Sequence, residues 1–158
     1  MTIVSNLHDD GAGSLGHPSG RFLLVRPETL VALQRACEAA LGPEAAAECF
    51  AAAGRAGGGR AAVTLTGSRE DRVRAISQMG TGFGWGEFRL ERLTPDTLVM
   101  TVRHSPFAEA YGPSPRPVCH LTRGVLEALA TVVLDRHRPI VETLCAASGA
   151  DACRFESR

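Results

Sequence analysis

The chain has 158 residues, of which 44% are hydrophobic and 22% are charged, as expected for one globular domain and not for a disordered chain. Its 17 basic residues, all of them arginine, balance 17 acidic residues, so the formal net charge is zero. Because neutralisation of phosphates supplies most of the affinity of proteins for nucleic acids, this balance argues against a nucleic-acid-binding function.

No apolar run approaches the roughly 20 residues that span a bilayer, and residues 1–20 lack the apolar centre of a secretory signal. We therefore expect a cytoplasmic protein without a membrane span, whose five cysteines are reduced. Residues 1–20 are polar and glycine-rich and are predicted to form a flexible arm, followed by a single domain over residues 21–158.

The first third of the chain predicts one strand and two helices. Residues 22–25 are typical of a short buried strand that Pro27 ends. A helix is expected from Pro27 to Leu41, with one inward face formed by Leu30, Leu33, Cys37 and Leu41. A second, alanine-rich helix is expected over about 43–53, and the glycine run at 57–59 is expected to break it.

The middle of the chain predicts a helix and a hairpin. Ser68 and Asp71 have the spacing of a capping box, so a third helix is expected to begin there. After the alternating glycines between Gly80 and Gly86, two alternating segments are expected to pair across a turn at 94–96. Residues 104–118 contain four prolines and are predicted to be a loop.

The last 40 residues predict one helix and two strands. The helix is expected from about Cys119 to Leu134, and Gly124 within it suggests a close approach to another element. Short strands are expected over 138–144 and 152–156. The predicted fold class is α/β (α+β): a single domain in which N-terminal helices pack on an antiparallel sheet with a C-terminal, cysteine-bearing hairpin.

Four potential metal ligands lie in this C-terminal part: Cys119, Glu142, Cys145 and Cys153. Thiolates and a carboxylate are competent zinc ligands, and a structural zinc ion takes four of them. The alternative is that the cysteines are small buried hydrophobic residues, since the spacing is not the paired Cys-x2-Cys pattern. Residues 142 and 145 would point to opposite faces of a regular strand, so a metal site needs a bulge or a helical turn. His120 is an alternative fourth ligand.

A resemblance to a known family rests on three segments. They are Pro117-Val118-Cys119-His120-Leu121 with Gly124, Val141 to Gly149, and Cys153-Arg154-Phe155. Together they resemble the C-terminal signature of the 4-vinyl reductase domain family, which includes the J protein of bacteriochlorophyll biosynthesis and the sensor domains of aromatic-responsive activators. The run from His120 to Gly124 and the run from Ser105 to Ala108 look more like the J protein.

The resemblance implies a small-molecule-binding domain that is often dimeric, and we expect a homodimer. In the aromatic sensors a Cys, a Glu and two further Cys hold zinc, which implies a structural zinc ion at Cys119, Glu142, Cys145 and Cys153. It further implies an accessory or carrier function in (bacterio)chlorophyll metabolism, with a hydrophobic aromatic or tetrapyrrole ligand.

The family name also implies reduction of a vinyl group, which the residues do not support by themselves. Hydride transfer needs a carrier such as a nicotinamide, and the glycines at 80–86 follow a helix and open a strand, the reverse of the dinucleotide-binding order. We therefore expect no intrinsic reductase activity. The alternatives are a true vinyl reductase that uses an external reductant, and a stand-alone sensor or scaffold.

The candidate ligand pocket consists of aromatic residues around the glycine-rich turn and the proline-rich loop, with a histidine at its mouth. Its predicted residues are Phe83, Trp85, Phe88, His104, Phe107 and Tyr111. An apolar pocket with few polar groups is the usual form of a small-ligand site, whereas the simpler interpretation is ordinary core packing. Arg103, Arg116 and Arg123 could meet a ligand carboxylate, or they could be solvated surface charges.

Overall fold

The computed structural model describes residues 3–18 and 20–158, so residues 1, 2 and 19 of the predicted arm lie outside the described residues. The helices are α1 (Pro27–Leu41), α2 (Pro43–Ala62), α3 (Arg69–Gly82), α4 (Pro106–Tyr111) and α5 (His120–Leu134), with short 3-10 turns η1 (Ile3–Asn6) and η2 (Ala146–Ser148). The main strands are β4 (Glu87–Leu93), β5 (Leu98–Arg103), β6 (Ile140–Leu144) and β7 (Cys153–Ser157).

These four strands form one antiparallel sheet in the order β4-β5-β7-β6. The expected hairpin pairs β4 with β5, and its turn is closed by the Thr94 N–H, which donates to the Thr97 carbonyl. The last strand of the chain, β7, lies between β5 and β6. In this register Cys153 is opposite Val102, in the middle of the sheet. The expected C-terminal hairpin is thus confirmed, and it contributes half of the sheet.

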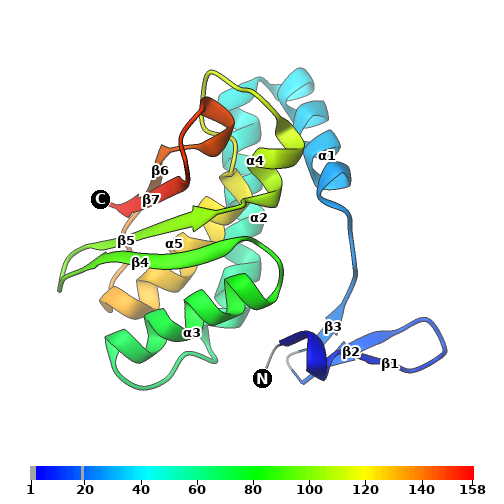
Figure 1. Ribbon diagram of the computed structural model, residues 1–158, viewed down its shortest axis with the longest axis vertical. Helices are drawn as coiled ribbons and strands as arrows, with labels where there is room; N and C mark the ends of the chain where they lie inside the picture. Colours follow the sequence, from blue (N-terminus) through cyan, green and yellow to red (C-terminus); the bar gives the residue numbers. More distant parts are fainter. Residues whose placement is uncertain (1–2, 19) are drawn as a thin grey trace.

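The helices form layers behind the sheet (Figure 1). Helix α5 packs against β6 and β7, α3 packs against β4, and α2 packs against the other side of α5. An inner helix has no face left for solvent, which is why α5 is apolar nearly all round. The predicted α+β class is confirmed, with the difference that α5, rather than the N-terminal α1 and α2, lies between the sheet and the outer helices.

Helices α2 and α5 approach each other so closely that their backbones touch. A Cβ atom added to Gly124 would lie 1.9 Å from the Ala51 carbonyl oxygen, and one added to Gly54 would lie 2.2 Å from the Leu121 carbonyl oxygen. The close approach predicted from Gly124 is therefore confirmed. The prediction that residues 57–59 break the helix is wrong, because α2 continues to Ala62 and uses Gly58 in the same contact.

Two further predictions are wrong in part: the inward face of α1 and the buried strand over residues 22–25. Leu33 and Leu41 of α1 are more than half exposed, whereas Val31 and Gln34 are buried. The face is rotated because α1 packs mainly against α2 and α4, and because the Gln34 amide donates to the Val118 carbonyl (3.2 Å), just before α5. Residues 23–25 form no strand, and their side chains are exposed, because none of the strands in residues 3–18 and 20–158 pairs with them.

Residues 104–118 are not wholly a loop, because they contain α4. Ser105 is the N-cap of α4 and Pro106 occupies its first turn, where a missing N–H costs nothing. The capping box predicted for α3 is confirmed: the Ser68 hydroxyl accepts from the Asp71 N–H and the Asp71 carboxylate accepts from the Ser68 N–H. Helix α3 then extends through Gly80 to Gly82, so the glycine-rich turn is shorter than expected.

Three short strands precede the domain: β1 (His8–Asp9), β2 (Leu15–His17) and β3 (Gly20–Phe22). They form a separate antiparallel sheet, joined to α1 by an extended stretch that stands off from the body in Figure 1. The Phe22 ring meets the Phe83 ring just after α3, with centroids 5.4 Å apart. The segment therefore has regular structure that the sequence did not predict.

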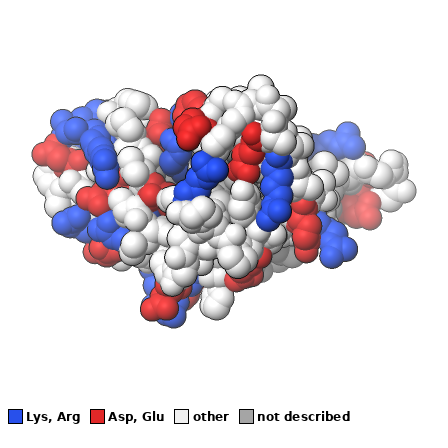
Figure 2. Space-filling model, turned by 90° about the horizontal axis from the view of Figure 1, so that it is seen from above, with Lys and Arg blue, Asp and Glu red and all other residues white. Residues whose placement is uncertain are grey.

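Charges are interspersed on the surface. Figure 2 shows arginines beside acidic residues across one whole face, with no large patch of either sign. Many of them pair, as Arg154 does with Glu91 and Glu156. None of the helices in residues 3–18 and 20–158 combines the length and apolar character that a bilayer span requires.

Candidate functional site

The four predicted metal ligands come together at one point in the structure. One ligand atom from each of Cys119, Glu142, Cys145 and Cys153 lies within 4.8 Å of the other three, and all four residues are buried. The sulfur atoms of Cys119 and Cys153 are 3.6 Å apart. This set contains Glu142, and the alternative ligand His120 is not part of it.

Different elements present each of these side chains. Cys119 is the N-cap of α5, and Cys153 opens β7. Glu142 lies in β6 and Cys145 just beyond its end, as the N-cap of η2. The pairing of β6 with β7 shifts register between Glu142 and Leu144. The bulge and the helical turn that the sequence argument required are therefore both present, and they turn residues 142 and 145 to the same side.

The donors shift one another's pKa strongly. Hydrogen bonds with Cys145 and Cys153, and then burial, raise the pKa of Cys119, whereas hydrogen bonds from Cys119 and Cys153 lower the pKa of Cys145. Burial, and then the negative charge of Cys145, raise the pKa of Glu142 to about 8. These shifts have one origin: four acids this close together, away from water, cannot all be anionic unless a cation lies among them.

The residues around the cluster supply hydrogen-bond donors. The Ser105 hydroxyl lies 3.3 Å from the Cys119 sulfur, and the Ala146 N–H donates to the Cys153 sulfur (3.4 Å). The Cys119 N–H donates to Oε2 of Glu142 (2.9 Å), while Oε1 of Glu142 is buried and accepts no hydrogen bond from the described residues. A buried carboxylate oxygen normally has a partner, so an unpartnered oxygen on the carboxylate that lies among three cysteines fits a metal ligand. The cluster could hold a metal ion.

A cavity of about 320 Å³ adjoins the cluster and shares Glu142 with it. It lies between the α1–α2 junction, residues 116–123 and β6. Its polar residues are Glu38, Glu44, Arg116, His120, Arg123 and Glu142, and its apolar residues are Pro43, Ala47, Pro117, Val118, Ile140 and Val141. Two of the three arginines suggested as ligand partners therefore line one cavity, whereas Arg103 is exposed elsewhere.

Charges around this cavity are mostly paired. Arg123 contacts Glu48 (3.4 Å) and donates to the Ala47 carbonyl (3.3 Å). Burial, and then the positive charge of Arg123, lower the pKa of His120, which keeps its imidazole neutral. With apolar walls and few unpaired charges, the cavity suits a small and largely apolar molecule better than a multiply charged one.

The predicted aromatic residues are distributed between the core and the surface. Phe88 and Phe107 are buried, and the ring of the half-buried Trp85 meets Phe107 edge to face, with centroids 5.1 Å apart. The Tyr111 hydroxyl donates to Glu38 (2.7 Å) at the edge of the cavity. The His104 side chain is 80% exposed and lies 3.8 Å from Glu109. Trp85 and Phe107 are thus neighbours, as the sequence argument requires.

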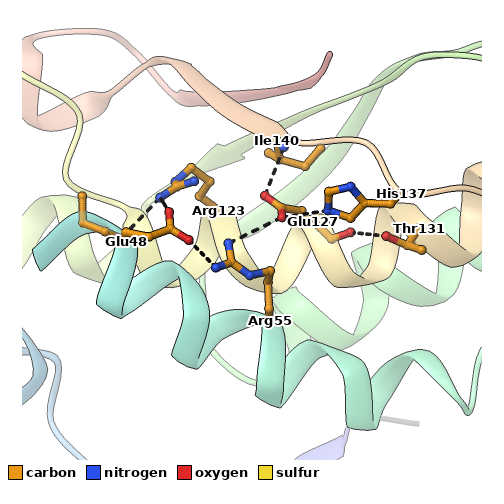
Figure 3. A network of polar contacts seen from close by, with 8 residues as sticks. Glu48, Arg55, Arg123, Glu127, Thr131, His137 and Ile140 are labelled. Carbon is orange, nitrogen blue, oxygen red and sulfur yellow. Dashed lines mark hydrogen bonds and ion pairs between the residues drawn. The ribbon is translucent and has the colours of Figure 1, made fainter. Parts of the chain in front are cut away.

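A buried carboxylate, Glu127 of α5, anchors the start of β6 (Figure 3). Its oxygens accept the backbone N–H of Ile140 (3.3 Å) and contact the ring of His137 (3.2 Å). Arg55 of α2 reaches the same carboxylate (3.5 Å) and also pairs with Glu48. The network therefore fixes α2, α5 and β6 relative to one another. It holds β6 at Ile140, two residues before Glu142.

Sequence reasoning missed three of these features: Ser105, the Glu127 network and the cavity. Ser105 had a usable signal, since a serine followed by a proline is typical of a helix N-cap. Glu127 carried a weaker one, an acid within an otherwise apolar helix. The cavity had none, because its walls come from segments far apart in the chain.

Comparison with known proteins agrees with the family resemblance. Residues 98–158 match the family model of the V4R domain. The part of the chain that carries β5, α5 and the Cys/Glu cluster is therefore similar to V4R domains, which confirms the resemblance to 4-vinyl reductase domains. No curated protein matches the chain.

Three solved structures share the fold. The phenol-responsive sensory domain of the transcription activator PoxR, solved with phenol, is 18% identical, covers 98% of this chain and 85% of its own, and has a TM-score of 0.86. A vinyl-4-reductase family protein from Methanocaldococcus jannaschii is 13% identical over 69% of this chain and 66% of its own, with a TM-score of 0.56.

The third is a trafficking protein particle complex subunit 3 from Naegleria fowleri covalently bound to palmitic acid. It is 13% identical over 84% of this chain and 93% of its own, with a TM-score of 0.59. At these identities the three structures establish a common fold. They do not bear on the closer likeness to the bacteriochlorophyll J protein, which stays a prediction.

Proposed function

We propose that this protein is a cytoplasmic small-molecule-binding module whose C-terminal half is held together by a zinc ion. The observation that carries the proposal is the buried cluster of three cysteines and Glu142, which shares Glu142 with a cavity of about 320 Å³. Zinc suits three sulfur donors and one carboxylate oxygen, and four protein ligands leave no open position for a reacting water. The ion would therefore be structural.

The metal is tested by elemental analysis of protein purified without added metal, with about one zinc ion per chain expected. Cys145→Ser should lose the metal and lower the stability of the C-terminal hairpin, because the affinity for a structural metal is also folding free energy. Cys49→Ser is the matched control, since Cys49 is exposed on α2 outside the cluster. Protein without any transition metal, whose cluster thiols react freely, would refute this part of the proposal.

We further propose that the ligand is hydrophobic, either a simple aromatic molecule or a tetrapyrrole, and that the protein acts as an accessory or carrier in (bacterio)chlorophyll metabolism. The family match and the fold shared over 98% of the chain with a phenol-responsive domain support a small-molecule ligand. Two segments, residues 105–108 and residues 120–124, look like the J protein, and this likeness favours a ligand from the tetrapyrrole pathway.

We take as the first candidate for the binding site the aromatic pair Trp85 and Phe107, together with the other predicted residues Phe83, Phe88, His104 and Tyr111, and as the second candidate the cavity beside Glu142. Phenol and protoporphyrin IX are suitable test ligands, because Trp85 is the single indole of the chain and reports binding by quenching. Phe107→Ala should weaken binding by about 1 to 3 kcal/mol, the value of one large apolar contact.

Ala47→Phe is the matched variant, because Ala47 lines the cavity beside Glu142, whereas Trp85 and Phe107 do not. Calorimetry can also show saturable binding that leaves the Trp85 emission unchanged. If Ala47→Phe abolishes that binding and Phe107→Ala binds with wild-type affinity, the binding site is the cavity and not the aromatic group. Failure of both ligands to bind would count against the binding function itself.

We also propose that the partner is a second copy of the chain. The Leu23 and Leu24 side chains, between the N-terminal sheet and α1, are 82% and 78% exposed, and a sheet of strands this short is rarely stable alone. Sedimentation should give a dimer, and the double variant Leu23→Glu/Leu24→Glu should give a monomer. A wild-type monomer at micromolar concentration would refute the proposal.

A further inference from the structure

The Ser105 side chain makes two contacts that together suggest more than helix capping. Ser105 is 2% exposed and lies between the end of β5 and the start of α4. Its oxygen accepts the N–H of Ala108 (3.4 Å), which is an ordinary N-cap contact. The same oxygen lies 3.3 Å from the sulfur of Cys119, 14 residues further along the chain.

The direction of the second hydrogen bond follows from the number of protons. The hydroxyl oxygen already accepts from Ala108 and has one hydrogen atom left to donate. A cysteine that binds a metal does so as a thiolate and has no proton. Between Ser105 and a metal-bound Cys119, the proton must therefore come from the serine.

The negative charge of the cluster explains why a hydrogen bond to the Cys119 sulfur is favourable. Three thiolates and one carboxylate carry four negative charges, of which a divalent cation balances two. The remaining charge lies in a buried site, where hydrogen-bond donors must replace water. The backbone N–H of Ala146 donates to Cys153, and Cys119 lies at the positive end of the 15-residue helix α5. Ser105 adds a side-chain donor to the Cys119 sulfur.

We propose that Ser105 is a positioning residue of the metal centre: its hydroxyl donates to the Cys119 thiolate, orients this ligand and offsets part of its charge. This inference rests on the proposed metal-binding function, and it adds a residue from outside the four-ligand set. It also means that one hydroxyl joins the metal centre to α4, the helix that carries Phe107 and Tyr111.

The test uses cobalt(II) as a spectroscopic substitute for zinc in the full-length protein. Ser105→Ala should lower the affinity for cobalt about 10- to 100-fold, as is usual when a partner of a metal ligand is removed. The sulfur-to-cobalt charge-transfer band should move to lower energy, because a thiolate without its hydrogen bond gives up electron density more readily. Ser105→Thr, which keeps the hydroxyl, should restore both properties.

Two further variants separate this function from helix capping. Ser105→Gly removes the hydroxyl at little cost to the cap, so it should show the same loss even if Ser105→Ala fails to fold. Ser68→Ala removes the equivalent cap of α3 and should leave the affinity and the band unchanged.

The outcomes distinguish this inference from the proposal on which it rests. Wild-type affinity and an unshifted band in Ser105→Gly would show that the serine only caps α4, and would overturn the inference while leaving the metal centre intact. Failure of the wild-type protein to bind cobalt or zinc would overturn the metal centre itself.

Discussion

The contact between α2 and α5 predicts that replacing glycine by alanine has opposite effects on the stability of the protein at two positions of α2. Gly54 and Gly57 lie one turn apart in α2. A Cβ atom at Gly54 would be 2.2 Å from the Leu121 carbonyl oxygen and 2.9 Å from the Val125 nitrogen, whereas one at Gly57 would meet nothing within 4 Å. Replacement by alanine should therefore destabilise at the first position and stabilise at the second.

The magnitudes follow from two opposing effects. Within a helix, alanine is favoured over glycine by about 1 kcal/mol, and both variants gain this. At Gly54 the new methyl group overlaps backbone atoms of α5, which cannot rotate away as a side chain could, so the helices must separate by roughly 1 Å. Overpacking of this kind typically costs about 1 to 3 kcal/mol, and the rigid backbone of α5 puts Gly54→Ala at about 2 to 3 kcal/mol before the gain from alanine is subtracted.

We therefore expect Gly57→Ala to raise the free energy of unfolding by about 0.5 to 1 kcal/mol and Gly54→Ala to lower it by about 1 to 2 kcal/mol. Urea unfolding of both variants, at equal metal content and with a common m-value, measures the difference. Equal stability of the two variants would refute the backbone contact, and with it the arrangement of α2 against α5.

Three further predictions concern other parts of the molecule. Glu127→Ala should lower the free energy of unfolding by about 1 to 3 kcal/mol in urea, because it leaves the buried N–H of Ile140 without an acceptor. The hydrogen bond from Arg55 lowers the pKa of Glu48 below the ordinary glutamate value of 4.5. The stability that this pair contributes is therefore fully present above pH 4.5, and it is lost as the pH falls below the lowered pKa of Glu48. Urea unfolding at pH 6 and at about pH 3 should thus show a smaller acid loss for Glu48→Gln than for the wild type. Incubation with NADH or NADPH and a divinyl chlorophyllide precursor should give no multiple turnovers, and sustained product formation by the purified protein alone would disprove this.

Local sequence determined most of the elements, because their signals lie within a few residues. The Ser68–Asp71 spacing placed the start of α3, and the alternation around residues 94–96 placed the β4–β5 hairpin. Likewise, the requirement for a bulge or a turn near Cys145 followed from the two-residue period of a strand alone. Where α4 was missed, four prolines outweighed the Ser105-Pro106 signal for a helix start.

Local signals failed where packing between distant segments decided the outcome. The glycines at 57–59 are poor helix formers by themselves, yet α2 runs through them because Gly58 lets it lie against α5. In α1, the pattern of leucines indicated one face, but contact with α2 and α4 selected another, so Leu33 is exposed and Gln34 is buried.

The candidate site divides in the same way. The types and spacing of Cys119, Glu142, Cys145 and Cys153 indicated a metal cluster, because the chemistry of a ligand is a property of the side chain itself. Only the tertiary structure could bring the ligand atoms at the N-terminus of α5, at the end of β6 and on the central strand β7 within 4.8 Å of one another. It also decided that Ser105 meets Cys119 and that a cavity adjoins Glu142, since contacts between segments far apart in the chain depend on how whole elements pack and leave no local trace in the sequence.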